Sequence, residues 1–369
     1  MNKTVIATAL GLVAIAPAVT QAAEATLYGR VWLEMYNAGK TTANGSASTF
    51  FGDDSSNIGI KGSEKINDNV TGYYKVEAGY NAMNGSIGNS GSAYHTPSPG
   101  FYTRFGYLGV KGKGFGSLTI GRQVDYYYSL IEDATYVTNV VYAPINPINA
   151  NGYTYRVDAI NYLSPDMNGL QIGLAYVGAG TDSKGQQQGM IQVGAKYAFG
   201  SGGYVNAAFM SIPKHNVGIN SGWYLSSLGA TRLGDAKNIA GIAAGYQFGA
   251  FGIDANFQRL SPRADGPSQL GSVTGTAGSV TSSVQTLAVQ GSYTAGDNYV
   301  YAQYSQAKWA AISKKTANRV TLGLNHHFSK QFSSSGELQL NNRYANSELV
   351  DSANAKANAV IAVGMRYNF

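Results

Sequence analysis

The feature of this sequence that most restricts its fold is a long series of segments in which apolar and polar residues alternate. In the segment 251–258, Phe, Ile, Ala and Phe take the odd positions, and Gly, Asp, Asn and Gln take the even ones. The last segment follows the same rule, with an apolar residue at every second position from Ala359 to Phe369. Successive side chains of a β-strand point to opposite faces, so each segment predicts a strand with one apolar and one polar face.

The links between the alternating segments are short and long in turn. Gly249–Ala250 and Ala295–Asp297 are short, whereas Gln123–Tyr153 and Ser211–Lys237 are long and rich in loop-forming residues. This order predicts an antiparallel up-and-down sheet whose strands, of about 10 residues, suit a tilted membrane crossing. The sixteen segments begin near residues 26, 56, 70, 102, 116, 154, 169, 189, 203, 238, 251, 282, 298, 318, 336 and 358.

The first residues have the composition of a secretory signal peptide. Lys3 gives a positive start, Val5–Val19 is mostly apolar, and Thr20–Ala23 offers small residues for cleavage. We therefore expect residues 1–23 to be removed, with the cut after Ala22 or Ala23, and residues 24–369 to form one domain. No later segment has 18 uninterrupted apolar residues, the length that a spanning helix requires.

Composition decides between the two architectures that alternation allows. A soluble β-sandwich carries abundant charge outside, but charged residues are only 12% here, against about 25% in ordinary domains. The polar faces hold mainly Gly, Ala, Asn, Gln and Thr. A membrane barrel faces lipid with its apolar side and encloses water with its polar side, and its sheet must close to satisfy the backbone. The sequence thus predicts an all-β transmembrane antiparallel β-barrel of 16 strands with an aqueous channel.

Six short stretches resemble the general porins of Gram-negative outer membranes, most closely the type found in β-proteobacteria. The resemblance spans the chain after residue 23 in order, and the C-terminal Phe adds to its specificity. The stretches are Leu27–Arg30, Ile58–Glu64, Leu108–Gly112, Gly121–Gln123, Arg156–Tyr162 and Met365–Phe369.

The resemblance implies a homotrimer of 16-stranded barrels in the outer membrane, with short periplasmic turns and long extracellular loops. The third loop would fold into each pore and narrow it. Tyr367 and Phe369 would form the signal that the outer-membrane barrel assembly machinery reads. The remaining partners implied are outer-membrane lipids, including lipopolysaccharide, and small hydrophilic solutes.

Alternation also predicts which charged side chains face the channel. With Leu27, Ile58 and Val76 facing lipid, and with Phe105 and Val157 also assigned outward, the residues of opposite parity point inward. The resemblance implies that three of the arginines line the basic wall of the constriction, and that Asn57 replaces an Arg that relatives can carry. The predicted basic wall is Arg30, Lys61, Lys75, Arg104 and Arg156, and the other inward residues are Glu34, Asn57, Glu77 and Asp158.

The acidic side of the constriction is expected on the long link between Arg122 and Arg156. Its acidic residues are Asp125, Glu132 and Asp133, of which Glu132 and Asp133 are favoured. The link lacks the Pro-Glu-Phe-Gly-Gly pattern of enteric relatives. The run Tyr126–Tyr128 either offers a surface for sugars and aromatic solutes or, as we expect, packs the loop against the wall.

These features predict an outer-membrane pore for passive diffusion of small hydrophilic solutes and ions. Net charge is +6, and loss of Lys3 leaves 25 basic and 20 acidic residues, which favours a modest anion preference. The alternatives are a channel selective for sugars or anionic metabolites, an outer-membrane enzyme, and an adhesin that uses the barrel as support.

Little in the sequence indicates catalysis, metal binding or nucleic-acid binding. There is no cysteine and no Gly-x-Ser-x-Gly elbow. His326 and His327 are adjacent on an expected strand and point to opposite faces, so they cannot chelate one metal ion. Basic residues are dispersed rather than clustered. We expect no enzymatic activity, no cofactor, no metal and no nucleic-acid partner.

Overall fold

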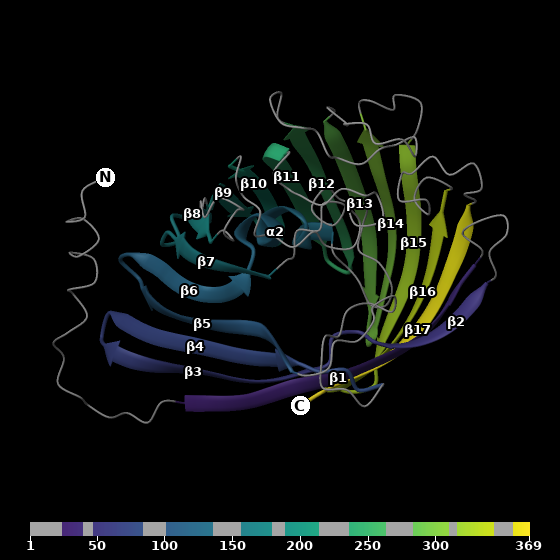
Figure 1. Ribbon diagram of the computed structural model, residues 1–369, viewed down its shortest axis with the longest axis horizontal. Coiled ribbons are helices and arrows are strands. Elements are labelled where there is room, and N and C mark those ends of the chain that lie inside the picture. The colour runs from purple at the N-terminus through teal and green to yellow at the C-terminus, as the bar shows by residue number, and fades with distance from the viewer. Residues whose placement is uncertain are drawn as a thin grey trace, which may run out of the picture.

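A computed structural model describes residues 24–39, 47–83, 101–135, 156–178, 189–213, 236–262, 283–309, 316–342 and 357–369. The predicted signal segment and most of the long links lie outside these ranges. Within them, one antiparallel sheet closes on itself around an open interior (Figure 1). Its strands are β1 (Glu24–Ala38), β2 (Ser48–Asp53), β3 (Asn57–Asn67), β4 (Val70–Gly79), β5 (Tyr102–Gly112), β6 (Gly116–Val124), β7 (Arg156–Leu163), β8 (Leu170–Val177), β9 (Met190–Phe199), β10 (Gly203–Ser211), β11 (Ala236–Phe248), β12 (Phe251–Pro262), β13 (Val284–Ala295), β14 (Asn298–Trp309), β15 (Thr316–His327), β16 (Phe332–Asn341) and β17 (Asn358–Asn368).

The seventeen strand segments of the described chain make sixteen barrel strands. β1 pairs with β2 from Leu33 onwards and with β3 up to Arg30, so β2 and β3 are two parts of one strand. Asp54–Ser56 interrupts that strand. The sixteen-stranded barrel predicted from alternation is therefore confirmed.

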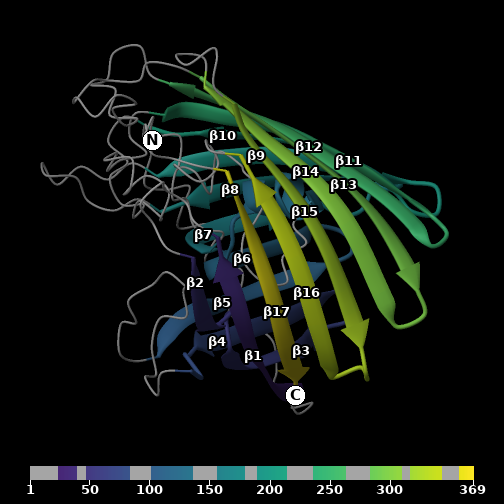
Figure 2. The ribbon, with the colours of Figure 1, turned by 90° about the vertical axis from the view of Figure 1, so that its right-hand side faces the viewer.

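The first and last strands close the barrel. β1 pairs with β17 from Arg30↔Asn368 to Ala38↔Val360. Beyond that register, Gly29 and Phe369 exchange two backbone hydrogen bonds of 2.9 and 3.0 Å. Figure 2 shows the C-terminus beside β1, with β11 to β17 slanted and side by side. All neighbouring strands are thus paired, as a sheet in hydrocarbon requires.

The outer surface is apolar and the inner surface is polar. Leu27, Leu108 and Met365 are 60% or more exposed, although each is a large apolar residue. The buried side chains include inward-facing amides such as Gln192 and Gln258, which have no exposed surface. This inversion of the usual arrangement is expected when the outer face contacts lipid acyl chains.

Short turns join the strands at one end of the barrel. The two-residue links Gly249–Ala250 and Gly296–Asp297 each begin with a glycine in the left-handed region, at φ values of 60° and 56°. A residue with a Cβ is strained in that region, so glycine favours these tight reversals. These links are two of the short turns predicted from the sequence.

The third long link enters the barrel. After β6 the chain forms the helix α2 (Tyr126–Ile131) and the 3₁₀ turn η2 (Asp133–Thr135). We name residues 125–135 the pore loop. Figure 1 shows α2 on the inner side of the sheet, where it packs against β8 to β12. This confirms the expectation of an inward-folded third loop. Among the described residues, no helix has the length and apolar character needed to span a membrane.

Candidate pore constriction

The pore loop is fixed where it leaves β6 by hydrogen bonds that the carboxylate of Asp125 accepts and by the side-chain amide of Gln192. Asp125 caps α2, because its Oδ1 accepts a 2.8 Å hydrogen bond from the backbone N–H of Tyr128. Its Oδ2 accepts a hydrogen bond from Nε2 of Gln192 on β9. The Oε1 of Gln192 accepts a 2.9 Å bond from the backbone N–H of Tyr127. The start of the helix is therefore tied to the wall.

Three glycines of the wall make room for the helix. A Cβ on Gly173 would lie 2.1 Å from Tyr126 Oη, and one on Gly194 would lie 2.4 Å from Leu130. A Cβ on Gly241 would lie 2.4 Å from Tyr127 Oη and 2.8 Å from Ile131. Such distances are shorter than any normal contact, so the helix seats directly on bare backbone at these positions.

The tyrosine run packs the pore loop to the wall, as expected. Tyr126, Tyr127 and Tyr128 are all buried, and Tyr127 has no exposed surface. Burial raises the pKa of Tyr126 to about 12 and raises that of Tyr127 well above its usual value. The hydroxyls therefore stay neutral. The alternative, an open tyrosine surface for solutes, does not match this burial.

The far end of the pore loop reaches the other side of the lumen. Asn206 Nδ2 donates a 2.8 Å hydrogen bond to the carbonyl of Leu130. Asn256 Nδ2 donates to Thr135 Oγ1 over 2.7 Å, and Gln303 on β14 donates to the Thr135 carbonyl. The loop thus crosses the interior between β6 and β14 and is held at both ends.

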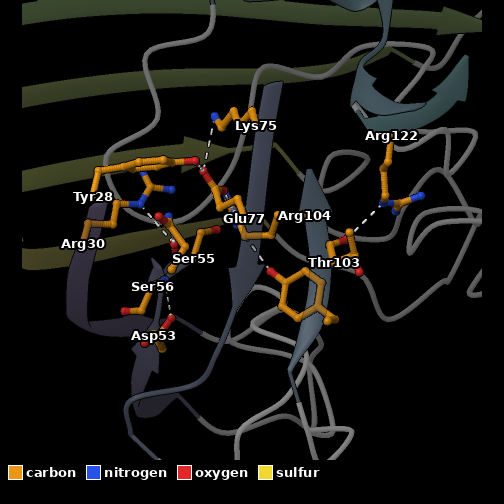
Figure 3. Close-up of polar contacts among 12 residues, drawn as sticks. Tyr28, Arg30, Asp53, Ser55, Ser56, Lys75, Glu77, Thr103, Arg104 and Arg122 are labelled. Atoms are coloured by element: carbon orange, nitrogen blue, oxygen red, sulfur yellow. Dashed lines mark hydrogen bonds and ion pairs between the residues drawn. The ribbon is translucent and has the colours of Figure 1, made fainter. Parts of the chain in front are cut away.

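A cavity of about 610 Å³ lies between the pore loop and the wall formed by β1, β3, β4, β5 and β17. It is lined by four cationic and three anionic side chains, with Asp133 as the pore-loop carboxylate. Figure 3 shows several of the wall residues directed toward one another. The charged lining residues are Arg30, Lys75, Arg104 and Arg366 together with Asp54, Glu77 and Asp133.

Glu77 is the hub of the wall, by which we mean that its carboxylate contacts three other side chains of the wall. Arg104 Nε donates to Glu77 Oε1 over 2.5 Å, and Lys75 Nζ lies 3.3 Å from Oε2. Tyr28 Oη donates to Oε2 over 2.9 Å (Figure 3). The side chains of Glu77 and Arg104 are only 5% and 4% exposed. A buried carboxylate with three donors holds two cations in place and neutralises part of their charge.

The break between β2 and β3 supplies acceptors for the neighbouring side chains. Ser55 has a φ of 78°, and its carbonyl accepts hydrogen bonds of 3.0 Å from Arg30 Nε and from Asn57 Nδ2. Asp53 Oδ1 accepts a 2.8 Å bond from the backbone N–H of Ser56. These contacts explain the orientation of Arg30 toward the cavity.

The structure brings most of the sequence-predicted constriction residues together. Arg30, Asn57, Lys75, Glu77, Arg104 and Asp133 line the same cavity. Arg156 lies beside it with its guanidinium 5.5 Å from the ring of Phe105, and Lys61 lies 5.4 Å from the ring of Tyr28. Glu34 is 5% exposed and has the carboxylates of Asp53, Asp54 and Glu337 as electrostatic neighbours.

Two outward assignments based on parity were wrong. Phe105 lines the cavity instead of facing lipid, because the β4–β5 register shifts between Glu77 and Ala78 and places consecutive residues of β5 at the lumen. Val157 is 6% exposed and packs in the same apolar cluster as Tyr126 and Leu130. The interior is apolar there because the pore loop fills it.

Two of the predicted acidic residues lie elsewhere. Asp158 has the opposite parity to Val157 and is on the outer face, where its side chain is 74% exposed and pairs with Arg122 over 3.4 Å. Glu132 is 1% exposed and does not line the cavity. Asp133 alone of the two favoured loop residues is exposed toward the cavity.

Sequence reasoning missed several lining residues, among them Arg366, Trp32 and Asp54. The sequence placed Arg366 on the polar face of the last strand, which is the inward face, but Arg366 was not assigned to the constriction. Trp32 has the inward parity of Arg30 but is apolar, so polarity gave no sign of it. Asp54 lies in the interruption of the β2–β3 strand, which alternation does not describe.

The prediction that the protein has no metal site also concerns His95 and His215, which lie in long links outside the described ranges. Among the residues that are described, no group of three His, Cys, Asp or Glu is placed to hold a metal ion. His326 Nδ1 lies 2.9 Å from Asn298 Oδ1 on β14.

A scan against family models matches residues 7–346 to the Gram-negative porin family. The chain belongs to this family. A porin of this type is an outer-membrane β-barrel channel for passive diffusion, in agreement with the polar inner surface described above. The localisation predicted from the sequence, the outer membrane of a Gram-negative bacterium, is confirmed.

Individual porins share modest sequence identity with the chain. Outer membrane protein Omp-EA of Erwinia amylovora is 29% identical over 245 residues, which span 62% of this chain and 59% of that protein. A monosaccharide porin of a Halomonas species is 25% identical over 290 residues, 72% of each chain. The anion-selective porin from Comamonas acidovorans superposes with a TM-score of 0.68 at 17% identity, covering 94% of this chain and all of that one. This last similarity establishes the barrel fold.

Proposed function

We propose that this porin is a general diffusion channel for small hydrophilic solutes and ions, with a modest preference for anions. The observation that carries the proposal is the charge of the cavity beside the pore loop, where four cationic side chains face three carboxylates. Arg156 and Lys61 lie next to the same wall and add to its positive potential. One excess cation in the cavity and two more nearby favour anions without excluding cations.

The arrangement of the charges also explains selection for polar solutes. Cations concentrate on the barrel wall, whereas Asp133 faces them from the pore loop. A transverse field between the two sides orders water and aligns small dipolar solutes. A lipophilic molecule would have to displace ordered water without replacing its interactions, which disfavours its passage.

Three further parts of the proposal rest on the resemblance to general porins. The active form is a homotrimer that contacts outer-membrane lipids, including lipopolysaccharide. The exposed rings of Tyr367 and Phe369, at the end of the chain, are the signal read by the barrel assembly machinery. Residues 1–23 are removed by signal peptidase, which leaves the barrel domain 24–369. We propose no catalytic activity and no cofactor.

Planar-bilayer recording of the purified protein tests the proposed function. One inserted trimer is expected to show three equal conductance levels as its pores close, and a salt gradient is expected to give a reversal potential of the sign that anions produce. A reversal potential of the opposite sign refutes the anion preference. Inserted particles that show a single conductance level refute the trimer.

A second candidate function is a channel with a preference for small sugars. The 25% identity to a monosaccharide porin supports it, as does a side cavity of about 460 Å³ between the pore loop and the wall. That cavity has polar lining groups on Gln171, Lys196, Tyr204 and Asn206. Saturable block of ion current by monosaccharides, with weaker block by disaccharides, favours this candidate. Conductance that is independent of added sugar favours general diffusion.

A further inference from the structure

The cations of the constriction wall lie over aromatic rings as well as beside carboxylates. The guanidinium of Arg30 is 4.9 Å from the centre of the Trp32 ring, and that of Arg366 is 5.3 Å from it. Arg30 precedes Trp32 on β1, whereas Arg366 is its cross-strand partner on β17. One indole therefore holds two arginines that meet only at the seam where the barrel closes.

A second ring holds another pair of cations. Lys75 Nζ is 4.1 Å from the centre of the Phe105 ring, and the Arg156 guanidinium is 5.5 Å from it. These cations come from β4 and β7, on either side of β5 and β6. The register shift between β4 and β5 turns Phe105 toward the lumen, where its side chain is nearly buried, with 8% exposed. An apolar ring placed in a polar lumen by a local irregularity of the sheet indicates a specific use.

A third ring links this pair to a further lysine. Tyr28 lies 5.4 Å from both Lys61 Nζ and Lys75 Nζ. Cations and rings thus alternate along the wall from Lys61 through Tyr28, Lys75 and Phe105 to Arg156. Long basic side chains have many rotamers, and like charges at these distances repel one another, so an unsupported cluster would spread.

A ring holds a cation in a different way from a carboxylate. The negative face of the ring attracts the cation, but the ring carries no net charge and leaves the charge of the cation intact. Glu77 fixes Arg104 and Lys75 while cancelling part of their positive charge. Trp32 and Phe105 hold their cations without cancelling any of the positive charge themselves.

We propose that Trp32 and Phe105 are positioning residues that set the anion selectivity of the pore by holding Arg30, Arg366, Lys75 and Arg156 toward the cavity. Neither ring carries charge, so their effect on selectivity acts through these cations. The proposal deepens the proposed function, because it states which uncharged side chains maintain the preference for anions.

The test compares leucine with aromatic replacements at the same positions. Trp32→Leu and Phe105→Leu are each expected to lower the chloride-to-potassium permeability ratio by about two- to fivefold, because each removes a ring that holds two cations. Trp32→Phe and Phe105→Tyr keep a ring and are expected to remain close to the wild type. Reversal potentials in a salt gradient give the ratio for each variant. Leucine variants with the wild-type ratio overturn the proposal, as do aromatic variants that lose as much as the leucine variants.

Two additional measurements separate positioning from folding and from the function itself. Pentafluorophenylalanine at position 105 keeps the shape of the ring but reverses the sign of its quadrupole, so its face no longer attracts a cation. The permeability ratio must therefore fall as it does with leucine. An unchanged ratio overturns the proposal. In a Lys75→Met, Arg156→Met background, Phe105→Leu must have no further effect. The wild-type reversal potential alone tests the anion preference, whereas the differences between leucine and aromatic variants test the positioning role.

Discussion

The hydroxyl of Tyr127 donates a 3.2 Å hydrogen bond to Oε1 of Gln258, a residue 131 positions further along the chain. Both side chains are buried, and Gln258 has no exposed surface. The bond joins α2 to β12 inside the barrel. The pore loop is therefore held firmly against the barrel wall. The position of the loop sets the width of the channel.

Removal of the Tyr127 hydroxyl is expected to loosen the pore loop. In Tyr127→Phe, Gln258 loses a partner in a site that water does not reach, which costs about 1–3 kcal/mol. We expect more frequent closure and greater current noise in single-channel recordings, with the mean open conductance little changed. Recordings as quiet as those of the wild type would contradict this account of the bond.

A side chain at Gly241 is expected to displace α2. The Cβ alone would lie 2.4 Å from Tyr127 Oη, so Gly241→Val must push the helix into the lumen or off its seat. We expect a changed single-channel conductance and an altered cut-off in liposome swelling with sugars of graded size. Gly291→Val on β13 is the matched control, because a Cβ there has nothing within 4 Å. Equal conductance of the two variants would argue against the seating role.

Neutralising Glu77 is expected to destabilise the barrel and increase its anion preference. Glu77→Gln removes the carboxylate that pairs with Arg104, a side chain that is 4% exposed, and breaking a buried pair costs on the order of 3–5 kcal/mol. The free energy of unfolding in urea with detergent measures the loss. Asp158→Asn is the control, because its exposed pair with Arg122 contributes about 0–1 kcal/mol. Similar losses in both variants would refute the assignment of Glu77 as the hub.

Arg366 is expected to contribute to selectivity although it lies at the end of the chain. Arg366→Met removes a cation that lines the cavity, and one unit charge near a passing ion is worth about 1 kcal/mol in water. The permeability ratio for anions should therefore fall about two- to fivefold. Arg122→Met removes a cation that pairs with Asp158 outside the lumen and should leave the ratio unchanged. The reversal potential in a salt gradient measures both variants.

Selectivity is expected to depend on pH through Asp133. Partial burial between the pore loop and the wall raises the pKa of its carboxyl. The negative charge is therefore lost, as the pH falls, at a higher pH than the value of about 3.9 for an ordinary Asp. Anion preference should rise as the pH is lowered from 7 towards 4. Asp133→Asn should show the higher preference already at pH 7 and a flatter profile. Parallel profiles of variant and wild type would exclude Asp133 as the titrating group.

Strand number, strand order and most inward residues were predictable because lipid on one side and water on the other impose a simple alternation. Leu27 and Val76 are exposed on the apolar face, and Arg30 and Lys75 line the cavity, as parity predicts. The inward-folded loop itself followed from a resemblance. Its exact seat, on Gly173, Gly194 and Gly241, depends on side chains that are distant in sequence.

The failures have two physical causes. At Phe105 a register shift changes the face that consecutive residues occupy, and nothing in local polarity marks such a shift. At Val157 the lumen is filled by the pore loop, so an apolar side chain points inward and the charged Asp158 points outward. Alternation assumes a water-filled interior, and it fails where protein replaces that water.

The pairing of Trp32 with Arg366 across the β1–β17 seam has a consequence for biogenesis. Arg30 and Arg366 share their ring only when β17 is paired with β1, so the first and last strands together complete this part of the charged wall. A chain truncated before β17 lacks both the closing edge and half of this cation pair. Closure of the sheet and assembly of this cation pair are therefore one and the same event.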